Sequence, residues 1–458
     1  MHLNLEQFQK IALAVLLFAL ISLWNIPHTI AGRYACEALL LIIILVYRPN
    51  WILFFKQNKF LLMLFIYLFF QLLFFSTNYS LAISNFKSEW MHFILFSIIG
   101  AGVGLVIGKY SSHKILLYLA IAFSTPLYVH LILSFIKGAS IGGIPWGYWG
   151  INEIHGDFGY PAMEASILLT TFYLYQAKTR IEKSLALGLI IACVASPLLA
   201  ASRGGTGFTI LAIIFVIMSY AFFSKAAGIV LKKNLLQLLT VSAIVLATIL
   251  IAPLSDPVRW SGALSRISVG LVGNSTSIYC KGVQVLEEDL LSKGIEITSE
   301  IKKRLDVMES GDSMRAMAVI SGYGLVFNNL MGIDQSKQAF QLAMIKECNG
   351  PPKIFIAHAH NAWIDSALAI GVPGAILLLM IMLRYAKLGW SAAATPTFGS
   401  PYGLALFASA CLWIARGILD STLRDQMLEM QAFVLALLLG IVISKKLQSA
   451  ENKIPNIC

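Results

Sequence analysis

The chain has 458 residues, of which 58% are hydrophobic and only 12% are charged. This composition excludes an ordinary soluble globular protein, in which about a quarter of the residues are charged. The formal charge of +11 would suit a nucleic-acid partner. However, the placement of the basic residues along the chain follows a membrane topology, so we expect no nucleic acid.

Apolar runs of about 18–25 residues recur along the chain, and each is long enough to cross roughly 30 Å of hydrocarbon as a helix. The first run lacks a small-residue cleavage site and is followed by a second span, so we expect it to be retained. The pattern predicts an all-α polytopic membrane protein of about twelve transmembrane helices, at residues 11–31, 34–54, 59–77, 91–108, 114–136, 161–178, 184–202, 204–224, 234–253, 362–386, 401–419 and 427–444.

The spans divide the chain into three parts. Residues 1–253 hold nine helices, residues 254–361 form a long segment, and residues 362–458 hold three helices and a short tail. With the amino terminus in the cytoplasm, 17 of the 34 Lys and Arg residues fall on cytoplasmic segments and 6 on the short connections of the other face. This positive-inside bias predicts that both termini are cytoplasmic. The other 11 basic residues lie in the long segment, where 11 acidic residues balance them.

The segment 254–361 is too long for a bare connection, so we expect it to fold on the outer face. Apolar residues at helical spacing predict three helices within it, at about 283–291, 297–308 and 312–327. Asp312 is a suitable N-cap for the third of them. Cys280 and Cys348 are the only cysteines of the segment and could form a disulfide in an oxidising compartment.

The run from Ala357 to Asp365 places two histidines, an amide and a carboxylate at the start of a long apolar helix. His358 and His360 belong to a residue type with a reference pKa near 6.5, which can accept a proton around neutrality. Asn361 suits the N-cap of the helix, whose positive end would favour a neutral imidazole and a nearby anion. Asp365 either orients a histidine or pairs with a neighbouring helix.

Two arginines are expected on the same outer side as these histidines. Arg203 lies in Ala201-Ser202-Arg203-Gly204-Gly205, at the tight turn between the seventh and eighth helices. Arg315 lies on the third helix of the long segment. An arginine at a membrane edge often only snorkels, but its planar fork also suits phosphate oxygens. Arginines and a base at a bilayer edge predict a site for a lipid-linked diphosphate.

Other features have simpler interpretations. Arg416 and Asp420 are four residues apart on one helical face, so we expect a local ion pair. The Gly-Val-Pro-Gly run at 371–374 is expected to kink or thin its helix for packing. The sequence shows no Walker loop, zinc-ligand spacing or convincing outer carboxylate cluster, so we expect neither a metal nor another cofactor.

The connection at 138–160 mixes aromatic residues with glycine and proline. This composition suits the interfacial belt of a membrane protein, and its rings could equally stack on sugars. Glu153, His155 and Asp157 in the same connection could bind a substrate or could be part of a solvated loop.

His360-Asn361, followed after nine residues by the run at 371–374, resembles the signature of the lipopolysaccharide O-antigen ligase family. This family belongs to the O-antigen ligase and polymerase superfamily, and it has twelve membrane helices with a large periplasmic loop between the ninth and tenth. The resemblance implies that His360 is the general base and that Arg203 and Arg315 bind the donor diphosphate. His358 lies outside the strict signature and is a secondary candidate, as are Asn361 and Asp365.

The implied reaction is an inverting, metal-independent transfer of a glycan from undecaprenyl diphosphate to a sugar hydroxyl of lipid A-core. The membrane would be the bacterial inner membrane, with the active site facing the periplasm and membrane lipid around the helices. Ala375 stands where the family usually has threonine or tyrosine, and Val319 where leucine commonly follows the loop arginine. These departures leave the subfamily open.

Three alternatives remain at this level. An O-antigen polymerase uses the same donor but often carries two sizeable exported loops, whereas only 254–361 is large here. A protein O-oligosaccharyltransferase tends to be longer, with extra exported sequence at its carboxyl end. A transporter of lipid-linked glycans would have its site near the bilayer midplane on broken helices, whereas the polar groups here lie at the outer edge.

Overall fold

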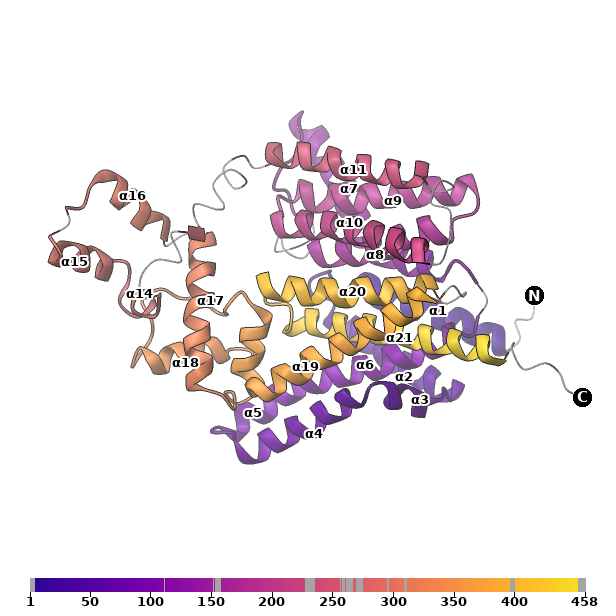
Figure 1. The fold of residues 1–458 in the computed structure, drawn as a ribbon, viewed down its shortest axis with the longest axis horizontal. Coiled ribbons are helices and arrows are strands. Elements are labelled where there is room, and N and C mark those ends of the chain that lie inside the picture. Colours follow the sequence, from indigo (N-terminus) through magenta and orange to yellow (C-terminus); the bar gives the residue numbers. More distant parts are fainter. Residues whose placement is uncertain are drawn as a thin grey trace, which may run out of the picture.

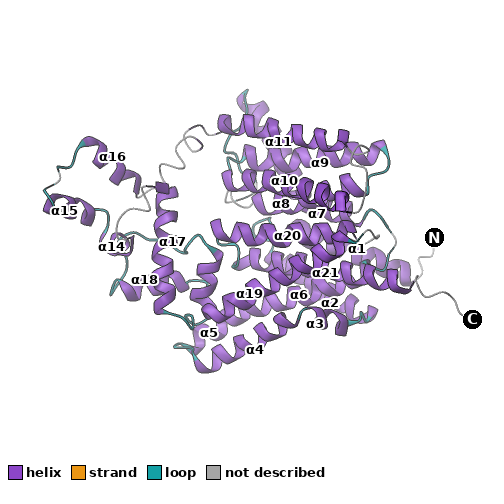
Figure 2. Cartoon of the chain, viewed as in Figure 1, coloured by secondary structure: helices purple, strands orange, loops and turns teal. Residues whose placement is uncertain are grey.

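The computed structural model of the chain is helical (Figures 1 and 2). It describes residues 5–110, 112–150, 152, 158–226, 235–255, 257, 260, 267–268, 275–294, 296–308, 311–395 and 400–451. Within these residues there is no β-strand. The prediction of an all-α polytopic membrane protein is therefore confirmed.

The membrane helices run back and forth through one bundle (Figure 1). Those before the long segment are α1 (Leu5–Leu23), α2 (Ile30–Tyr47), α3 (Trp51–Gln57), α4 (Lys59–Phe74), α5 (Tyr79–Asn85) with the π-helical turn η1 (Phe86–Trp90), α6 (Met91–Ile107), α7 (Ile115–Ile141), α8 (Gly159–Tyr175), α9 (Arg180–Leu199), α10 (Arg203–Ala226) and α11 (Leu235–Ser255). Those after it are α19 (Ala362–Ala394), α20 (Ser400–Leu419) and α21 (Asp425–Glu451).

Each of the twelve predicted apolar segments contains a helix, but fewer than twelve of these helices are long and apolar enough to span a membrane. By length and composition, nine helices of the described chain could cross it, or ten if the bent pair α3–α4 is one span. The apolar part of α1 (Gln7–Leu23) and α8 are shorter, with 17 residues each. The count of twelve is reached only when these two are included.

Several predicted spans have wrong boundaries: α1 ends at Leu23 rather than at residue 31, and α19 and α21 continue beyond the predicted ends at 386 and 444. Two further spans differ in how the helix is built. The span at 34–54 is broken, because α2 ends before Arg48, which has a left-handed backbone, and Pro49 has no N–H to continue the helix. α3 then meets α4 at an angle of 79°. The span at 91–108 begins earlier, at Tyr79, because α5, η1 and α6 form one continuous apolar helix.

The core of the bundle lies between α6 and α21. The apolar stretch of α21 is buried inside the protein along its whole length. Gly100 and Gly104 of α6 face the backbone carbonyl groups of Phe433 and Leu437, and a Cβ at either glycine would overlap these oxygen atoms. Small residues four apart allow helices in a membrane to approach this closely.

Five helices of the long segment gather at the end of the bundle away from the start of α1 and the end of α21 (Figure 1). They are α14 (Ser275–Lys281), α15 (Gln284–Ser292), α16 (Ser299–Met308), α17 (Gly311–Asn328) and α18 (Ala339–Glu347). The three predicted helices correspond to α15, α16 and α17. The predicted N-cap is wrong: α17 begins at Gly311, and Asp312 lies in its first turn.

Cys280 and Cys348 form a disulfide that joins the end of α14 to the end of α18. Their Cα atoms are 5.1 Å apart, and the bridge closes a sequence separation of 68 residues. The sequence alone did not decide whether these cysteines pair, and the structure shows that they do.

Replacing Cys280 with serine should loosen the long segment. Closing a loop of this length restricts the unfolded chain by about 4 kcal/mol in the chain-entropy model. We expect the segment to be cleaved by trypsin at lower temperature in Cys280→Ser than in the wild type. Dithiothreitol should sensitise the wild type and leave Cys280→Ser unchanged; equal effects on both proteins would contradict this prediction.

α19 is broken at Gly371, where φ is 78° and ψ is 163°. This conformation is nearly restricted to glycine. The segment after α17 binds the exposed backbone groups, with the N–H of Val372 donating to the carbonyl of Leu330 at 2.9 Å and the N–H of Ile333 donating to that of Leu368 at 2.7 Å. Thus the kink predicted for 371–374 is confirmed, and it docks the long segment against the membrane helices.

Replacing Gly371 with alanine should be strongly destabilising. A Cβ there would lie 2.7 Å from the carbonyl carbon of Met331, and the backbone is already in the glycine region. We expect a loss of at least about 2 kcal/mol of unfolding free energy, measured by thermal unfolding in detergent. Gly188→Ala is the matched control, because Gly188 lies inside α9 and a Cβ there would have no atom within 4 Å. A similar loss in both variants would contradict the assignment.

A buried histidine of α7 holds the aromatic connection at 138–160 against the bundle. The ring of His130, buried in α7, contacts the carbonyl oxygen of Tyr148 at 2.9 Å and the hydroxyl of Ser196 at 2.8 Å. Neither the interfacial nor the sugar-stacking interpretation is tested by these contacts. The residues Glu153, His155 and Asp157 lie outside the described part of the chain.

Candidate active site at the start of α19

The candidate site lies where α19 begins, at the end of the bundle that carries α17 (Figure 1). Asn361 caps α19 as predicted: its side-chain oxygen accepts hydrogen bonds from the N–H groups of Trp363 and Ile364, at 3.0 and 3.1 Å. Its amide nitrogen donates to the carbonyl of Ile418 at 3.0 Å. The cap therefore fixes the start of α19 to the last turn of α20.

The two histidines pack against each other directly before this cap. Their ring centroids are 4.1 Å apart, and the ring planes are inclined by 67°. His360 has a left-handed backbone with φ of 50°. Side chains with a Cβ rarely adopt this conformation, and such strain is concentrated at functional sites. The cap at Asn361 follows directly and holds the backbone of His360 in this conformation.

Burial and positive neighbours keep both imidazoles neutral. Desolvation, aided by His358 and Arg315, lowers the pKa of His360 to about 3. Desolvation, aided by Arg424, lowers the pKa of His358 to about 4, although Asp420 acts in the opposite direction. At neutral pH both rings are unprotonated, which is the form that can accept a proton.

Asp365 is bound to the histidine segment, as one of its two predicted interpretations requires. Its Oδ1 accepts a hydrogen bond from the N–H of Ala359 at 2.8 Å, and its Oδ2 accepts one from the hydroxyl of Ser421 at 2.5 Å. The same hydroxyl lies 2.9 Å from Nδ1 of His358. Asp365 therefore reaches His358 through Ser421.

α17 brings Arg315 into the electrostatic environment of both histidines. Gly322 of α17 packs on Ile364, and a Cβ there would lie 2.6 Å from a methyl carbon of Ile364, so α17 crosses directly over the start of α19. The positive charge of Arg315 lowers the pKa of both imidazoles. Its side chain is exposed and forms no hydrogen bond or ion pair with the residues that the structure describes. Arg315 is thus available to an anion.

Arg203 is held beside α17 by an ion pair. Its Nη2 donates to Oδ1 of Asp312 at 2.7 Å, and the two side chains are 25% and 12% exposed. Because Asp312 and Arg315 are three residues apart on α17, this pair places Arg203 one helical turn from Arg315. The turn at the start of α10 and the long segment therefore meet at the same place.

The connection between α20 and α21 supplies residues that the sequence analysis did not assign to the site. Arg424, whose Nε donates to Asp425 at 3.0 Å, has the largest effect of any charged neighbour on the pKa of His358. Asp420 and Ser421 follow the last turn of α20 and reach the histidines from the other side. Their signal in the sequence was a polar run between two apolar helices, the same pattern that marks the segment before α19.

The predicted ion pair between Arg416 and Asp420 is present but weak. The nearest atoms, Nη2 and Oδ2, are 3.9 Å apart. The hydroxyl of Tyr160 donates to the same Asp420 oxygen at the shorter distance of 2.8 Å, and the guanidinium of Arg416 stacks on the Tyr160 ring, 3.6 Å from its centre. Tyr160, at the start of α8, thereby orients Asp420 toward the site.

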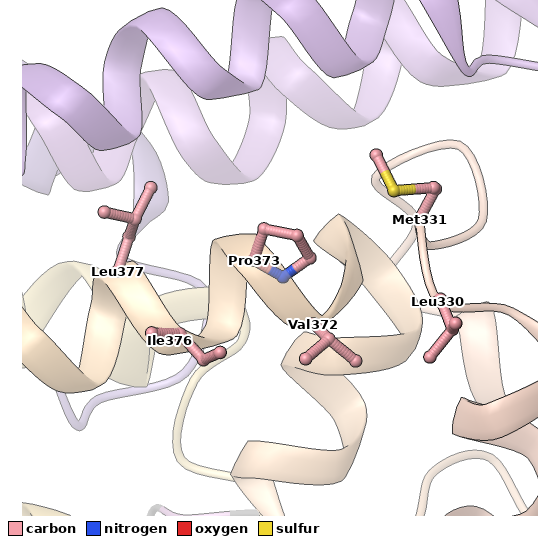
Figure 3. Close-up of a pocket in the computed structure, with 6 residues that line it drawn as sticks. All are labelled: Leu330, Met331, Val372, Pro373, Ile376 and Leu377. Carbon is pink, nitrogen blue, oxygen red and sulfur yellow. The ribbon is translucent and has the colours of Figure 1, made fainter.

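An apolar groove of about 600 Å³ lies beside the break in α19 (Figure 3). Leu330 and Ile376 on its wall are about half exposed, at 52% and 51%. The lining residues come from the segment after α17 and from α19: Leu330, Met331, Val372, Pro373, Ile376 and Leu377.

Among the described residues, no group of three or more His, Cys, Asp and Glu side chains is arranged to hold a metal ion. No protein family model matches the chain, and no curated protein matches it at a significant level. The chemistry of the site must therefore be inferred from its own residues and from the resemblance of its motifs.

Proposed function

We propose that this protein is a glycosyltransferase of the O-antigen ligase type, which moves a glycan from undecaprenyl diphosphate to a sugar hydroxyl of lipid A-core. The observation that carries the proposal is His360, a neutral imidazole on a strained backbone, within the electrostatic reach of Arg315, which has no hydrogen-bond or ion-pair partner among the described residues. A base beside a guanidinium suits a substrate that loses a proton at one atom and releases a diphosphate at another.

In this reaction His360 takes the proton from the acceptor hydroxyl as the oxygen attacks the anomeric carbon from the face opposite the diphosphate. The new carbon–oxygen bond forms while the bond from the anomeric carbon to the diphosphate breaks, so the configuration inverts. The electron pair of the broken bond leaves on the diphosphate. Arg315, with Arg203 one turn away, stabilises the developing negative charge.

Donor binding would also strengthen the base. Desolvation, His358 and the positive charge of Arg315 together hold the pKa of His360 at about 3. A diphosphate next to Arg315 neutralises that charge and adds negative charge, and both effects raise the pKa of a nearby imidazole. His360 would therefore become an effective proton acceptor when the donor is in place.

The apolar groove gives the lipid part of the donor a place to lie. Its wall is formed by apolar side chains and a proline, and it lies beside Gly371, where the segment after α17 docks against α19. An isoprenoid chain whose diphosphate is bound at Arg315 would extend in this direction. We place the site on the periplasmic face of a bacterial inner membrane, with both termini in the cytoplasm, because the basic residues are concentrated at the opposite end.

A lipopolysaccharide gel from a strain that lacks the protein tests this proposal. Loss of the whole ladder, with polymer accumulating on undecaprenyl diphosphate, is the expected result, and wild-type protein should restore it. A surviving band of core plus one repeat would instead identify a polymerase. An unchanged ladder would overturn both and leave protein glycosylation or transport.

A further inference from the structure

Three hydrogen-bonded side chains connect the first turn of α19 to the histidine pair. Asp365 contributes Oδ2, Ser421 contributes its hydroxyl, and His358 contributes Nδ1, with separations of 2.5 and 2.9 Å. The three residues belong to three segments: the first turn of α19, the connection before α21, and the run before α19. Ser421 is only 7% exposed, so water does not compete strongly for its hydroxyl.

The hydrogen-bond donors along this chain can be assigned by counting. The Asp365 carboxylate offers only acceptors and already receives the N–H of Ala359, so Ser421 must supply the proton of the 2.5 Å contact. A hydroxyl has one hydrogen, which leaves Ser421 as the acceptor toward His358. Nδ1 of His358 must therefore carry the proton of the 2.9 Å contact.

One contact competes with this assignment. The backbone N–H of His360 also points to Nδ1 of His358, at 3.4 Å. A protonated Nδ1 cannot accept it, but a contact of 3.4 Å is beyond the usual hydrogen-bond range, whereas 2.9 Å is near the optimum. The shorter contact decides the tautomer, and His358 keeps its lone pair on Nε2.

We propose that Asp365, Ser421 and His358 form a positioning chain for His360. The chain fixes the tautomer and ring orientation of His358, against which the His360 imidazole packs at 4.1 Å. His360 needs such support, because its left-handed backbone offers no regular helix or strand to hold its side chain. This inference rests on the proposed role of His360. It makes Ser421, in the connection between α20 and α21, a positioning residue of the site.

The positioning chain predicts a specific pattern in the kinetics of transfer by the purified, reconstituted protein. His358→Gln, Ser421→Ala and Asp365→Asn should each lower kcat by at least about tenfold, because a misplaced general base loses part of a contribution of about 10²–10⁴. KM for the lipid-linked donor should stay within about twofold, since none of the three binds the diphosphate. Ser421→Thr keeps the hydroxyl and should retain activity, and Thr422→Ala is a neighbouring control.

A double variant separates positioning from simple packing. Ser421→Ala should have no further effect when His358 is already glutamine, because Ser421 then has no His358 imidazole left to orient. The acidic limb of the kcat profile should move to higher pH in His358→Gln, since His358 helps to lower the pKa of His360. Other charges that face the pair are unchanged in this comparison: Arg315, Asp420, Arg424 and Asp425 act on the imidazoles, and Asp365 is hydrogen-bonded to the segment that carries them. Wild-type kcat in His358→Gln, or a further loss in the double variant, would overturn the inference.

An independent readout does not depend on the proposed reaction. Nitrogen NMR of ¹⁵N-histidine-labelled protein should show His358 protonated at Nδ1, and Ser421→Ala should mix the two tautomers. Protonation at Nε2 in the wild type would refute the chain even if transfer is confirmed. Conversely, absence of transfer by the wild type would refute the proposed function and leave the tautomer result standing.

Discussion

Replacing His360 with alanine is expected to abolish detectable glycan transfer. A positioned general base contributes about 10²–10⁴-fold to such a step, and no other described group shares its strained position beside Arg315. In cells, a strain that carries only His360→Ala should show lipid A-core without the ladder. In a reconstituted assay, kcat should fall while KM for the donor changes little, because the imidazole acts on the acceptor hydroxyl.

The matched control for this prediction is His113→Ala. His113 lies at the opposite end of the bundle, where its ring contacts the carboxylate of Glu182 at 3.2 Å. It has the same side chain and lies on the same protein, but it is far from the start of α19, so transfer should remain close to normal. Near-normal transfer by His360→Ala at normal expression would rule out His360 as the base.

Much of the fold could be predicted because a bilayer imposes simple rules on the sequence. Apolar runs long enough to cross it must be helical, since only a helix satisfies its own backbone hydrogen bonds there. The break was missed although Arg48-Pro49-Asn50 interrupts the apolar run, because apolar residues resume at once from Trp51 and the two parts together have the length of one span. The length of the helix through α5 and α6 was also missed, because its polar first turns, capped by Asn78, do not read as a membrane span.

For the candidate site, only the contacts between residues close in sequence could be predicted. His360 and Asn361 could be placed because a capped helix start depends on neighbours in sequence. The pairing of Arg203 with Asp312 joins residues 109 apart, and that of Ser421 with His358 joins residues 63 apart. No local pattern specifies such contacts. They follow from the break at Gly371, where the segment after α17 is docked, and from the bond between Asn361 and the end of α20.

Replacing Arg315 with alanine should have the second largest effect, and it should act on the donor. Charge-assisted hydrogen bonds are worth about 1.5–3 kcal/mol, so losing the guanidinium should lower kcat/KM by about 10–150-fold, mainly through KM for the lipid-linked donor. Arg315→Lys should recover only part of this loss, since it keeps the charge but not the planar fork. Lys346→Ala, which removes an exposed charge from α18 in the same long segment, is the control and should leave KM unchanged.

The same variant should change the pH dependence in a direction that the electrostatics fix. Arg315 helps to hold the pKa of His360 at about 3, so its removal raises that pKa. The base works only when unprotonated, above its pKa, and the acidic limb of the kcat profile must therefore move to higher pH in Arg315→Ala. Activity at pH 5 should fall more than activity at pH 8, as measured in the same vesicles. An unchanged acidic limb together with a raised KM would mean that Arg315 binds the donor at a distance from His360, whereas an unchanged kcat/KM would remove Arg315 from the donor site.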